Sequence, residues 1–227
     1  MANTPLLIYG AGGFAREVAW LAETCQRHGN GLEPVAFIDD HADPDRPRIV
    51  NGLPVFSLES AVRQYPGAAV TAAIGNPKAR QIVTEKALAA GLRLVALVHP
   101  RVEMSRFVDL GSGAVICAGN VLTTNIALGT GVQVNLDCTI GHDAILDDYV
   151  TLAPGAHVSG NVHLGKRVYV GTGAVIINGS LDAPLIIGDD AVIGAGACVT
   201  KSVGGGVTAV GVPAKPLERK VLANAAA

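Results

Sequence analysis

Residues 134–152 read VNLDCTIGHDAILDDYVTL, and every sixth residue of this stretch is aliphatic: Val134, Ile140, Leu146 and Leu152. The same step of six continues in both directions, and it is interrupted by an insertion at residues 178–184 before it resumes. The aliphatic positions of the whole repeat are Val98, Met104, Leu110, Ile116, Leu122, Leu128, Val134, Ile140, Leu146, Leu152, Val158, Leu164, Val170, Ile176, Ile187, Ile193 and Val199. An amphipathic helix repeats every 3.6 residues and a strand every two, so neither produces this pattern. A six-residue repeat instead predicts a parallel β-helix, in which three hexads form one triangular coil around an aliphatic interior.

A second set of positions, four residues after most of these aliphatic residues, carries small or β-branched side chains, with Asn120 as the exception. A polar side chain inside the prism is costly unless it finds a hydrogen-bond partner. The insertion at 178–184 adds about five residues to one coil, and we expect it to protrude as a loop.

The first 97 residues show short apolar runs that alternate with helical periodicity. The expected strands lie at residues 5–9, 35–38 and 70–74, and the expected helices begin near residues 13, 58 and 77. This βαβαβ order predicts a parallel sheet with right-handed crossovers.

Composition favours small-molecule partners and an intracellular location. The net charge is −2 without a block of like charges, which excludes the electrostatic footprint of a nucleic-acid binder. The four cysteines show no C-x-x-C spacing, which favours reduced thiols in a cytoplasmic protein. No apolar run reaches eighteen residues, and the start lacks the pattern of a signal peptide, so we expect no membrane insertion.

Several motifs together carry a resemblance to a known family. They are the hexads, GVPAK at 211–215, GAGGF at 10–14, FIDD at 37–40, AIGN at 73–76 with Arg80, VHP at 98–100 and GHDA at 141–144. With these motifs the chain resembles the hexapeptide-repeat nucleotide-sugar acetyltransferases, such as bacterial UDP- or GDP-4-amino-sugar N-acetyltransferases and sialic acid O-acetyltransferase-like proteins. The resemblance implies an α/β Rossmann-like half-domain followed by a left-handed parallel β-helix, a homotrimer, and acetyl-CoA bound between adjacent prisms. The expected domains are a nucleotide-sugar-binding domain at 1–97, the β-helix at 98–203, and a C-terminal loop and tail at 204–227.

The candidate catalytic pair is His142 and Asp143, which follow Ile140 and Gly141 at a corner of a coil, where side chains face outward. Imidazole has a pKa of about 6.5, so it can take a proton from an attacking amine or hydroxyl at neutral pH. Asp143 could hold the tautomer of the ring. The histidine taken by itself favours an exposed turn residue, whereas the resemblance implies that His142 is the general base.

Gly160 follows His142 by one coil of three hexads, so its backbone should lie at the same corner, about 4.8 Å along the stack. The resemblance implies that its N–H polarises the thioester carbonyl, and that Asn135 lies near the acetyl group, more easily contacted from an adjacent subunit. It further implies a pantetheine arm that runs past the residues Ala153, Gly155, Gly171, Gly173, Gly194 and Ala195. We expect no metal, because His157 and His163 are six residues apart and therefore lie on different faces.

The front domain carries Gly10-x-Gly12-x-x-Ala15 between a strand and a helix, with Asp39 at the end of the second strand. This motif alone indicates a dinucleotide, but 97 residues provide only half of a dinucleotide-binding domain, so a single nucleotide fits better.

The resemblance assigns the nucleotide of the sugar substrate to this half-fold. It places the glycine-rich turn of Gly10, Gly12 and Gly13 near phosphates and the pair Asp39 and Asp40 near the base or ribose. Asn76 and Arg80 lie one helical turn apart at a strand end, so we expect both to face the same crevice, with Arg80 available to a phosphate. Phe14 and Arg16 occupy positions where amino-sugar N-acetyltransferases often carry His or another small polar residue.

The leading hypothesis is transfer of an acetyl group from acetyl-CoA to the amino group of a nucleotide-linked amino sugar, a 4-amino-4-deoxy sugar, for surface glycan biosynthesis. The alternatives are a sugar O-acetyltransferase and a non-catalytic, nucleotide-sensing trimer. A β-helical metal hydratase is disfavoured by the spacing of the histidines.

Overall fold

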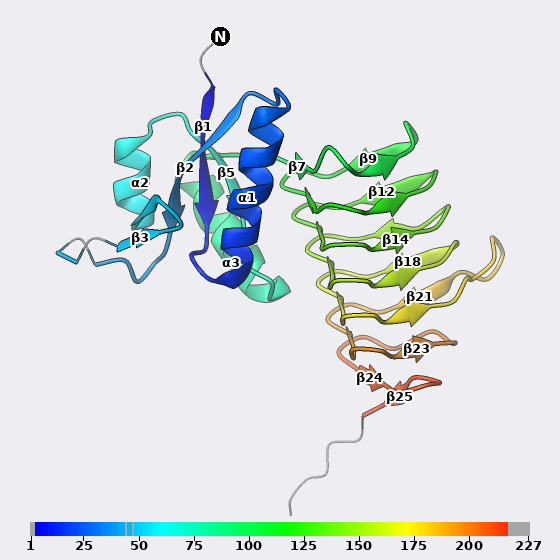
Figure 1. The fold of residues 1–227 in the computed structure, drawn as a ribbon. Coiled ribbons are helices and arrows are strands. Elements are labelled where there is room, and N and C mark those ends of the chain that lie inside the picture. The colour runs from blue at the N-terminus through cyan, green and yellow to red at the C-terminus, as the bar shows by residue number, and fades with distance from the viewer. Residues whose placement is uncertain (1–2, 44, 47, 218–227) are drawn as a thin grey trace, which may run out of the picture.

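The computed structural model describes residues 3–43, 45–46 and 48–217, which form an α/β part and a triangular β-helix side by side (Figure 1). The elements of the first part are β1 (Thr4–Tyr9), α1 (Gly13–Arg27), β2 (Leu32–Ile38), β3 (Arg48–Val50), β4 (Leu53–Phe56), α2 (Leu58–Gln64), β5 (Ala69–Ala72), α3 (Pro77–Ala89) and β6 (Arg93–Leu94). The six strands form one sheet in the order β3-β4-β2-β1-β5-β6, and only β3 runs antiparallel to its neighbour. The predicted βαβαβ core is confirmed, and the β3–β4 hairpin and β6 are additions that the sequence pattern did not predict.

The second part is a stack of short parallel strands. They are β7 (Leu97–Val98), β8 (Glu103–Met104), β9 (Val108–Leu110), β10 (Val115–Ile116), β11 (Val121–Leu122), β12 (Ile126–Leu128), β13 (Gln133–Val134), β14 (Thr139–Ile140), β15 (Ile145–Leu146), β16 (Thr151–Leu152), β17 (His157–Val158), β18 (Val162–Leu164), β19 (Tyr169–Val170), β20 (Val175–Ile176), β21 (Leu185–Ile187), β22 (Val192–Ile193), β23 (Cys198–Val199), β24 (Thr208–Val210) and β25 (Lys215–Pro216).

These strands form the three faces of a prism, each named here by its first strand. The β7 sheet contains β7, β10, β13, β16, β19, β22, β24 and β25; the β8 sheet contains β8, β11, β14, β17, β20 and β23; the β9 sheet contains β9, β12, β15, β18 and β21. Up to the insertion, successive strands within a face pair eighteen residues apart, as in Gln133 with Val115, so the predicted three-hexad coil is confirmed. Pairs that span the insertion are 23 residues apart, as in Tyr169 with Val192.

The interior of the prism holds the aliphatic residues of the hexads, and most of them are fully buried in one cluster. Met104 is an exception, because 38% of it is exposed. Its strand β8 is the first of its sheet and pairs on one side only, so the open end of the prism leaves this side chain uncovered.

Asn120 lies in this prism with no exposed surface. Its side-chain nitrogen donates to the carbonyl oxygens of Cys117 (2.8 Å) and Val134 (3.3 Å), and its side-chain oxygen accepts from the N–H of Cys138 at 2.7 Å. The amide therefore links two coils, and its hydrogen bonds offset the cost of burying it.

The stack continues beyond residue 203, because β24 pairs in parallel with β22 and β25 then pairs antiparallel with β24. The segment expected as a C-terminal loop therefore contains two strands, and residues 218–227 of the expected tail lie outside the described residues. The insertion at 178–184 forms the predicted protruding loop (Figure 1), and Leu181 within it is 85% exposed.

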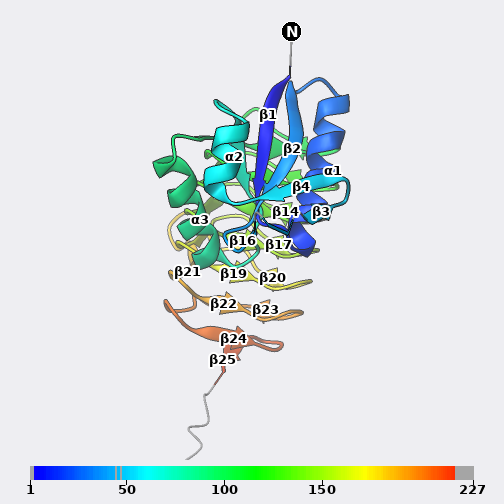
Figure 2. The ribbon, with the colours of Figure 1, turned by 90° about the vertical axis from the view of Figure 1, so that its left-hand side faces the viewer.

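Helix α1 packs against the first coils of the prism, as Figure 2 shows from the side of the α/β part. Ala15, Val18 and Leu21 of this helix share one buried cluster with Leu97 and Val115 of the prism. This apolar contact joins the two parts at one end of the stack. Among the described residues, no helix is both long and apolar enough to cross a membrane.

Candidate active site

The pair His142 and Asp143 lies at the corner between the β8 sheet and the β9 sheet, directly after β14. The Nδ1 atom of His142 lies 2.8 Å from Oδ2 of Asp143, and 57% and 43% of the two side chains are exposed. The hydrogen bond with His142, followed by that from Asn125, holds the pKa of the Asp143 carboxyl below its usual value. A carboxylate on Nδ1 favours the tautomer in which that nitrogen carries the proton, which leaves Nε2 as a base.

Gly160 lies against the other edge of the imidazole ring. A Cβ atom built on Gly160 would lie 2.6 Å from both Cε1 and Nε2 of His142. Within the described part of the chain, the Gly160 N–H donates no hydrogen bond, whereas its carbonyl accepts from the N–H of Gly179. The expected alignment over one coil is therefore present, with a backbone donor next to the His142 ring.

Asn135 occupies a different corner, between the β7 sheet and the β8 sheet. It is 9% exposed, and its side-chain nitrogen donates to the carbonyl oxygen of Leu152 at 2.7 Å. The strands β16, β19 and β22 are stacked in turn on β13. Ala153, Gly171 and Gly194 are the residues that directly follow these three strands, so they continue the column of residues that Asn135 begins after β13. The predicted residues Gly155, Gly173 and Ala195 belong to the turns of the same corner. His142 and Asn135 thus lie at opposite edges of the β8 sheet, and one chain does not bring them together.

The α/β part contains a cavity of about 480 Å³ at the carboxyl ends of β1, β2 and β5. Its lining includes the predicted residues Gly10, Gly12, Gly13, Asp39 and Asp40, together with Tyr9, Ala11, Phe14, Ile38, His41, Ala73, Ile74, Gly75 and Val83. Crevices at this edge of parallel sheets are the usual ligand sites of such folds.

At two positions of the glycine-rich turn, the structure explains why the residue is a glycine. Gly10 has a φ of 118°, and a Cβ there would lie 2.9 Å from the carbonyl oxygen of Ala73. Gly12 is the N-cap of α1 and supplies no side-chain cap, so the first N–H groups of the helix remain open to the cavity. Such a helix start favours an anion.

The two carboxylates of the cavity are each held by neighbouring groups. Asp39 accepts from Arg48 at 2.7 Å and from the N–H of His41 at 3.0 Å. Asp40 accepts from the hydroxyl of Tyr9 and from the ammonium group of Lys86. Burial of Asp40 opposes its ionisation, but the hydrogen bonds from Lys86 and Tyr9 outweigh this effect, so its pKa is lowered.

Tyr9, Arg48 and Lys86 were not predicted as site residues. Burial, and then the contact with Asp40, raises the pKa of the Tyr9 phenol, so Tyr9 acts as a neutral donor in the cavity. Its place as the last residue of β1 was visible in the sequence. Arg48 and Lys86 are 9 and 46 residues away from their partners in sequence, and nothing local marks them.

Arg80 does not face the crevice, which contradicts the prediction that it is available to a phosphate. Its side chain has no exposed surface. The guanidinium donates to acceptors of both parts of the chain: the carbonyls of Ile74, Gly75, Gly131, Tyr149 and Val150, Oε1 of Gln133 and Oγ1 of Thr151. All of these acceptors are neutral, and burial lowers the pKa of the guanidinium to about 9.

Arg80 therefore fixes the loop after β5 onto the prism, and two side chains add to this contact. Gln133 donates to the carbonyl of Ala72 at 2.8 Å, and Thr151 donates to that of Gly75 at 3.3 Å. Asn76 caps α3 by accepting from the N–H of Ala79 at 3.0 Å and does not line the crevice. The structure thus separates Asn76 and Arg80 from the predicted nucleotide site.

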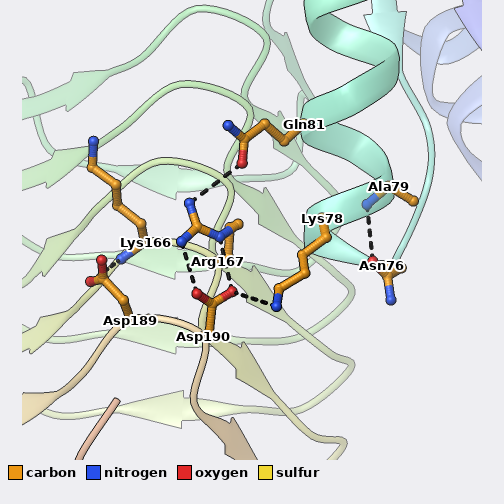
Figure 3. A network of polar contacts seen from close by, with 8 residues as sticks. All are labelled: Asn76, Lys78, Ala79, Gln81, Lys166, Arg167, Asp189 and Asp190. Atoms are coloured by element: carbon orange, nitrogen blue, oxygen red, sulfur yellow. Dashed lines mark hydrogen bonds and ion pairs between the residues drawn. The ribbon is translucent and has the colours of Figure 1, made fainter. Parts of the chain in front are cut away.

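A second polar contact between the two parts lies beside the start of α3, as Figure 3 shows. Arg167 binds both oxygens of Asp190, at 2.9 and 2.8 Å, and Lys78 of α3 lies 3.3 Å from Oδ1 of Asp190. The hydrogen bonds from Arg167, which have the largest effect, and the smaller contribution of Lys78 lower the pKa of Asp190 to about 2.

The chain shows no group of three or more His, Cys, Asp or Glu arranged to hold a metal ion within residues 3–217, residues 44 and 47 aside. Cys25, Cys117 and Cys138 are buried free thiols, and Cys198 is half-buried. Acid–base chemistry at His142 and ligand binding in the crevice are what these residues can support.

Comparison with known proteins links both parts of the chain to sugar acetyltransferases. Residues 5–87 match the family model of the PglD N-terminal domain. The chain is 36% identical to GDP-perosamine N-acetyltransferase of Escherichia coli O157:H7 over 214 residues, which cover 93% of this chain and 96% of that protein.

Solved structures agree with this relationship. WeeI from Acinetobacter baumannii AYE superposes with a TM-score of 0.86 at 37% identity, over 95% of this chain and all of that one. PerB from Caulobacter crescentus, solved in complex with CoA and GDP-perosamine, superposes with a TM-score of 0.83 at 31% identity, over 96% of this chain and 99% of that one.

Proposed function

Because this chain belongs to the hexapeptide-repeat nucleotide-sugar acetyltransferases, the family of GDP-perosamine N-acetyltransferase, we propose that it acetylates the amino group of a nucleotide-linked 4-amino-4-deoxy sugar. Acetyl-CoA is the donor, and the product serves surface glycan biosynthesis. The observation that carries this proposal is the combination, in one chain, of an exposed His–Asp pair beside a free backbone donor with a nucleotide-sized crevice.

In the proposed reaction, Nε2 of His142 accepts a proton from the sugar amine as the nitrogen attacks the thioester carbon. Asp143 on Nδ1 stabilises the imidazolium that forms. The N–H of Gly160 donates to the oxygen of the tetrahedral intermediate, and the C–S bond then breaks. The departing thiolate of CoA takes the proton from the imidazolium, so the base returns to its starting form.

The crevice of the α/β part holds the nucleotide in this proposal. The open N–H groups at the start of α1 face the diphosphate, and Asp39 and Asp40 accept hydrogen bonds from base or ribose. The ion pair of Asp39 with Arg48 supports this role, because it fixes a carboxylate that lines the cavity.

The acetyl donor binds, in this proposal, between neighbouring prisms of a homotrimer. The pantetheine arm runs along the corner of Asn135, Ala153, Gly171 and Gly194, and the thioester meets His142 of the adjacent chain. Support comes from the positions of Asn135 and His142 at opposite edges of the β8 sheet, where a neighbouring copy is needed to bring the two together.

The test is release of free CoA thiol from acetyl-CoA with a panel of GDP-, UDP- and dTDP-linked 4-amino sugars and matched neutral sugars, with GDP-perosamine first. We expect release with one amino sugar and N-acetylated product by mass spectrometry, and loss of turnover in His142→Ala. Release only with neutral sugars would replace the proposal by O-acetylation. If no sugar of the panel causes release of CoA thiol, but the protein still binds a nucleotide sugar, the proposal is replaced by that of a non-catalytic, nucleotide-sensing protein.

A further inference from the structure

The corner that carries His142 also carries a column of three residues with left-handed backbone. Asn125, Asp143 and Asn161 follow one another at intervals of one coil, with φ angles of 55°, 57° and 55°. Because their backbones are stacked, the side chain of one can contact that of the next. Asn125 thus lies one coil below the carboxylate that orients the base.

Asn125 makes a hydrogen bond to that carboxylate. Its Nδ2 donates to Oδ1 of Asp143 at 3.2 Å, while Oδ2 of the same carboxylate binds Nδ1 of His142 at 2.8 Å. Each carboxylate oxygen therefore has its own partner, one on each side. Rotation about the terminal torsion moves both oxygens, so it must break both hydrogen bonds here, whereas a carboxylate with a single partner would lose only one.

The orientation of the Asn125 amide is itself determined by its neighbours. The hydroxyl of Thr124 donates to Oδ1 of Asn125 at 3.4 Å, and the carbonyl of Thr124 accepts from the N–H of Asp143 at 3.1 Å. With a donor facing its oxygen, the amide presents its nitrogen to Asp143. The side chains of Thr124, Asn125, Asp143 and His142 thus form a chain of hydrogen bonds, in that order.

We propose that Asn125 is a positioning residue for acetyl transfer, which acts through Asp143 to hold the His142 ring with its proton on Nδ1 and with Nε2 facing the reacting amine. The inference rests on the proposed function only for the identity of the reaction. The pair needs such support because it is half exposed, so water competes for the carboxylate. At metal sites, mutating a residue that hydrogen-bonds to a metal ligand, without touching the metal itself, lowers metal affinity or activity by about 10- to 100-fold.

A double-mutant cycle tests the order of contact. Asn125→Gly keeps the left-handed backbone, which glycine adopts without strain, and removes the donor. We expect kcat to fall about 10-fold, with the KM for both substrates and the thermal midpoint unchanged. In an Asp143→Ala background, Asn125→Gly should cause no further loss, because the carboxylate that it acts on is gone.

The matched control is Asn51→Gly, which makes the same exchange at an exposed left-handed asparagine (φ 45°) in the β3–β4 hairpin. Its kcat should equal that of the wild type. An unchanged kcat in Asn125→Gly, or an equal loss with and without Asp143, would overturn the inference.

A second readout does not depend on turnover. Nitrogen-15 NMR of histidine-labelled protein, with the His142 signals identified from His142→Ala, reports which ring nitrogen carries the proton. We expect the Nδ1–H tautomer in the wild type and a mixture in Asn125→Gly; an identical tautomer ratio in both would overturn the inference. The two proposals can fail separately. If the wild type acetylates no acceptor, but the tautomer ratio still differs between wild type and Asn125→Gly, the proposed reaction is refuted and the role of Asn125 in orienting the ring is supported.

Discussion

Gly160 and His142 lie in contact one coil apart, and the imidazole occupies the space that a side chain on Gly160 would need, 2.6 Å from Cε1 and Nε2. The two segments are tied together by the N–H of Asn161, which donates to the carbonyl of His142 at 2.9 Å. The backbone of Gly160 does not adopt a left-handed conformation. The ring of His142, and not the fold of the chain, is therefore what demands a glycine here.

Gly160→Ala should accordingly impair catalysis more than stability. The added methyl group must displace the His142 ring from Asp143, so we expect kcat to fall at least about 10-fold, as it does when one preorganised donor or orienting group is lost. Steady-state kinetics and thermal unfolding check this. Gly204→Ala is the control, because a Cβ there meets only Val207 at an ordinary 3.7 Å. A fully active Gly160→Ala enzyme would remove the proposed contact from the mechanism.

Arg80→Met should destabilise the fold strongly, because it leaves the carbonyls of Ile74 in the α/β part and of Tyr149 in the prism without their donor in a buried site. Each hydrogen bond to a charged group contributes about 1.5–3 kcal/mol, so we expect a loss of at least about 3 kcal/mol in the free energy of unfolding. Denaturant titration measures it. Arg63→Met, which removes an exposed pair with Glu59, should cost at most about 1 kcal/mol. Equal costs for the two variants would mean that Arg80 does not join the two parts.

Asp39→Ala should raise the apparent KM for the nucleotide sugar and leave that for acetyl-CoA unchanged. The carboxylate lines the crevice and holds Arg48 at its edge, whereas the corner of Asn135 belongs to the prism. Initial rates with each substrate varied in turn give the two constants. Asp43→Ala, at an exposed carboxylate outside the crevice, is the control. An equal rise in both constants would argue against a nucleotide site in the α/β part.

Asp190→Asn should reduce stability at neutral pH, with an effect that disappears in acid. The folded-state pKa of Asp190 is about 2, below the ordinary value of 3.8, because Arg167 and then Lys78 bind its carboxylate. A depressed carboxyl pKa contributes stability above the unfolded pKa, and this contribution is lost as pH falls through the folded pKa. The difference in unfolding free energy between wild type and variant, about 2 kcal/mol at neutral pH, should therefore shrink between about pH 4 and pH 2. Unfolding titrations across that range measure it, and a pH-independent difference would contradict the ion-pair explanation.

Much of the fold was predictable because its signals are local and repeated. The hexads predicted the coil length, and residues such as Val134 and Leu152 stack in the prism as expected. The prediction was wrong at Met104 and in the segment after residue 203, because the ends of a stack depend on which neighbour covers them. Asn120 looked like an exception, and its partners became visible only when two neighbouring coils were in place.

The sequence by itself determined the period of the prism, the half-domain in front of it, and the pairing of His142 with Gly160, because a repeat of fixed length converts separation along the chain into position in space. Only the tertiary structure decided which groups Arg80 and Asn125 contact. The acceptors of Arg80 on the prism lie 51 to 71 residues away along the chain, and an arginine after a strand is equally suited to a phosphate or to buried carbonyls. Asn125 is also one coil from Asp143, but whether its amide meets the carboxylate depends on side-chain torsions and on Thr124. Contacts of this kind follow from packing between distant segments, which no local pattern encodes.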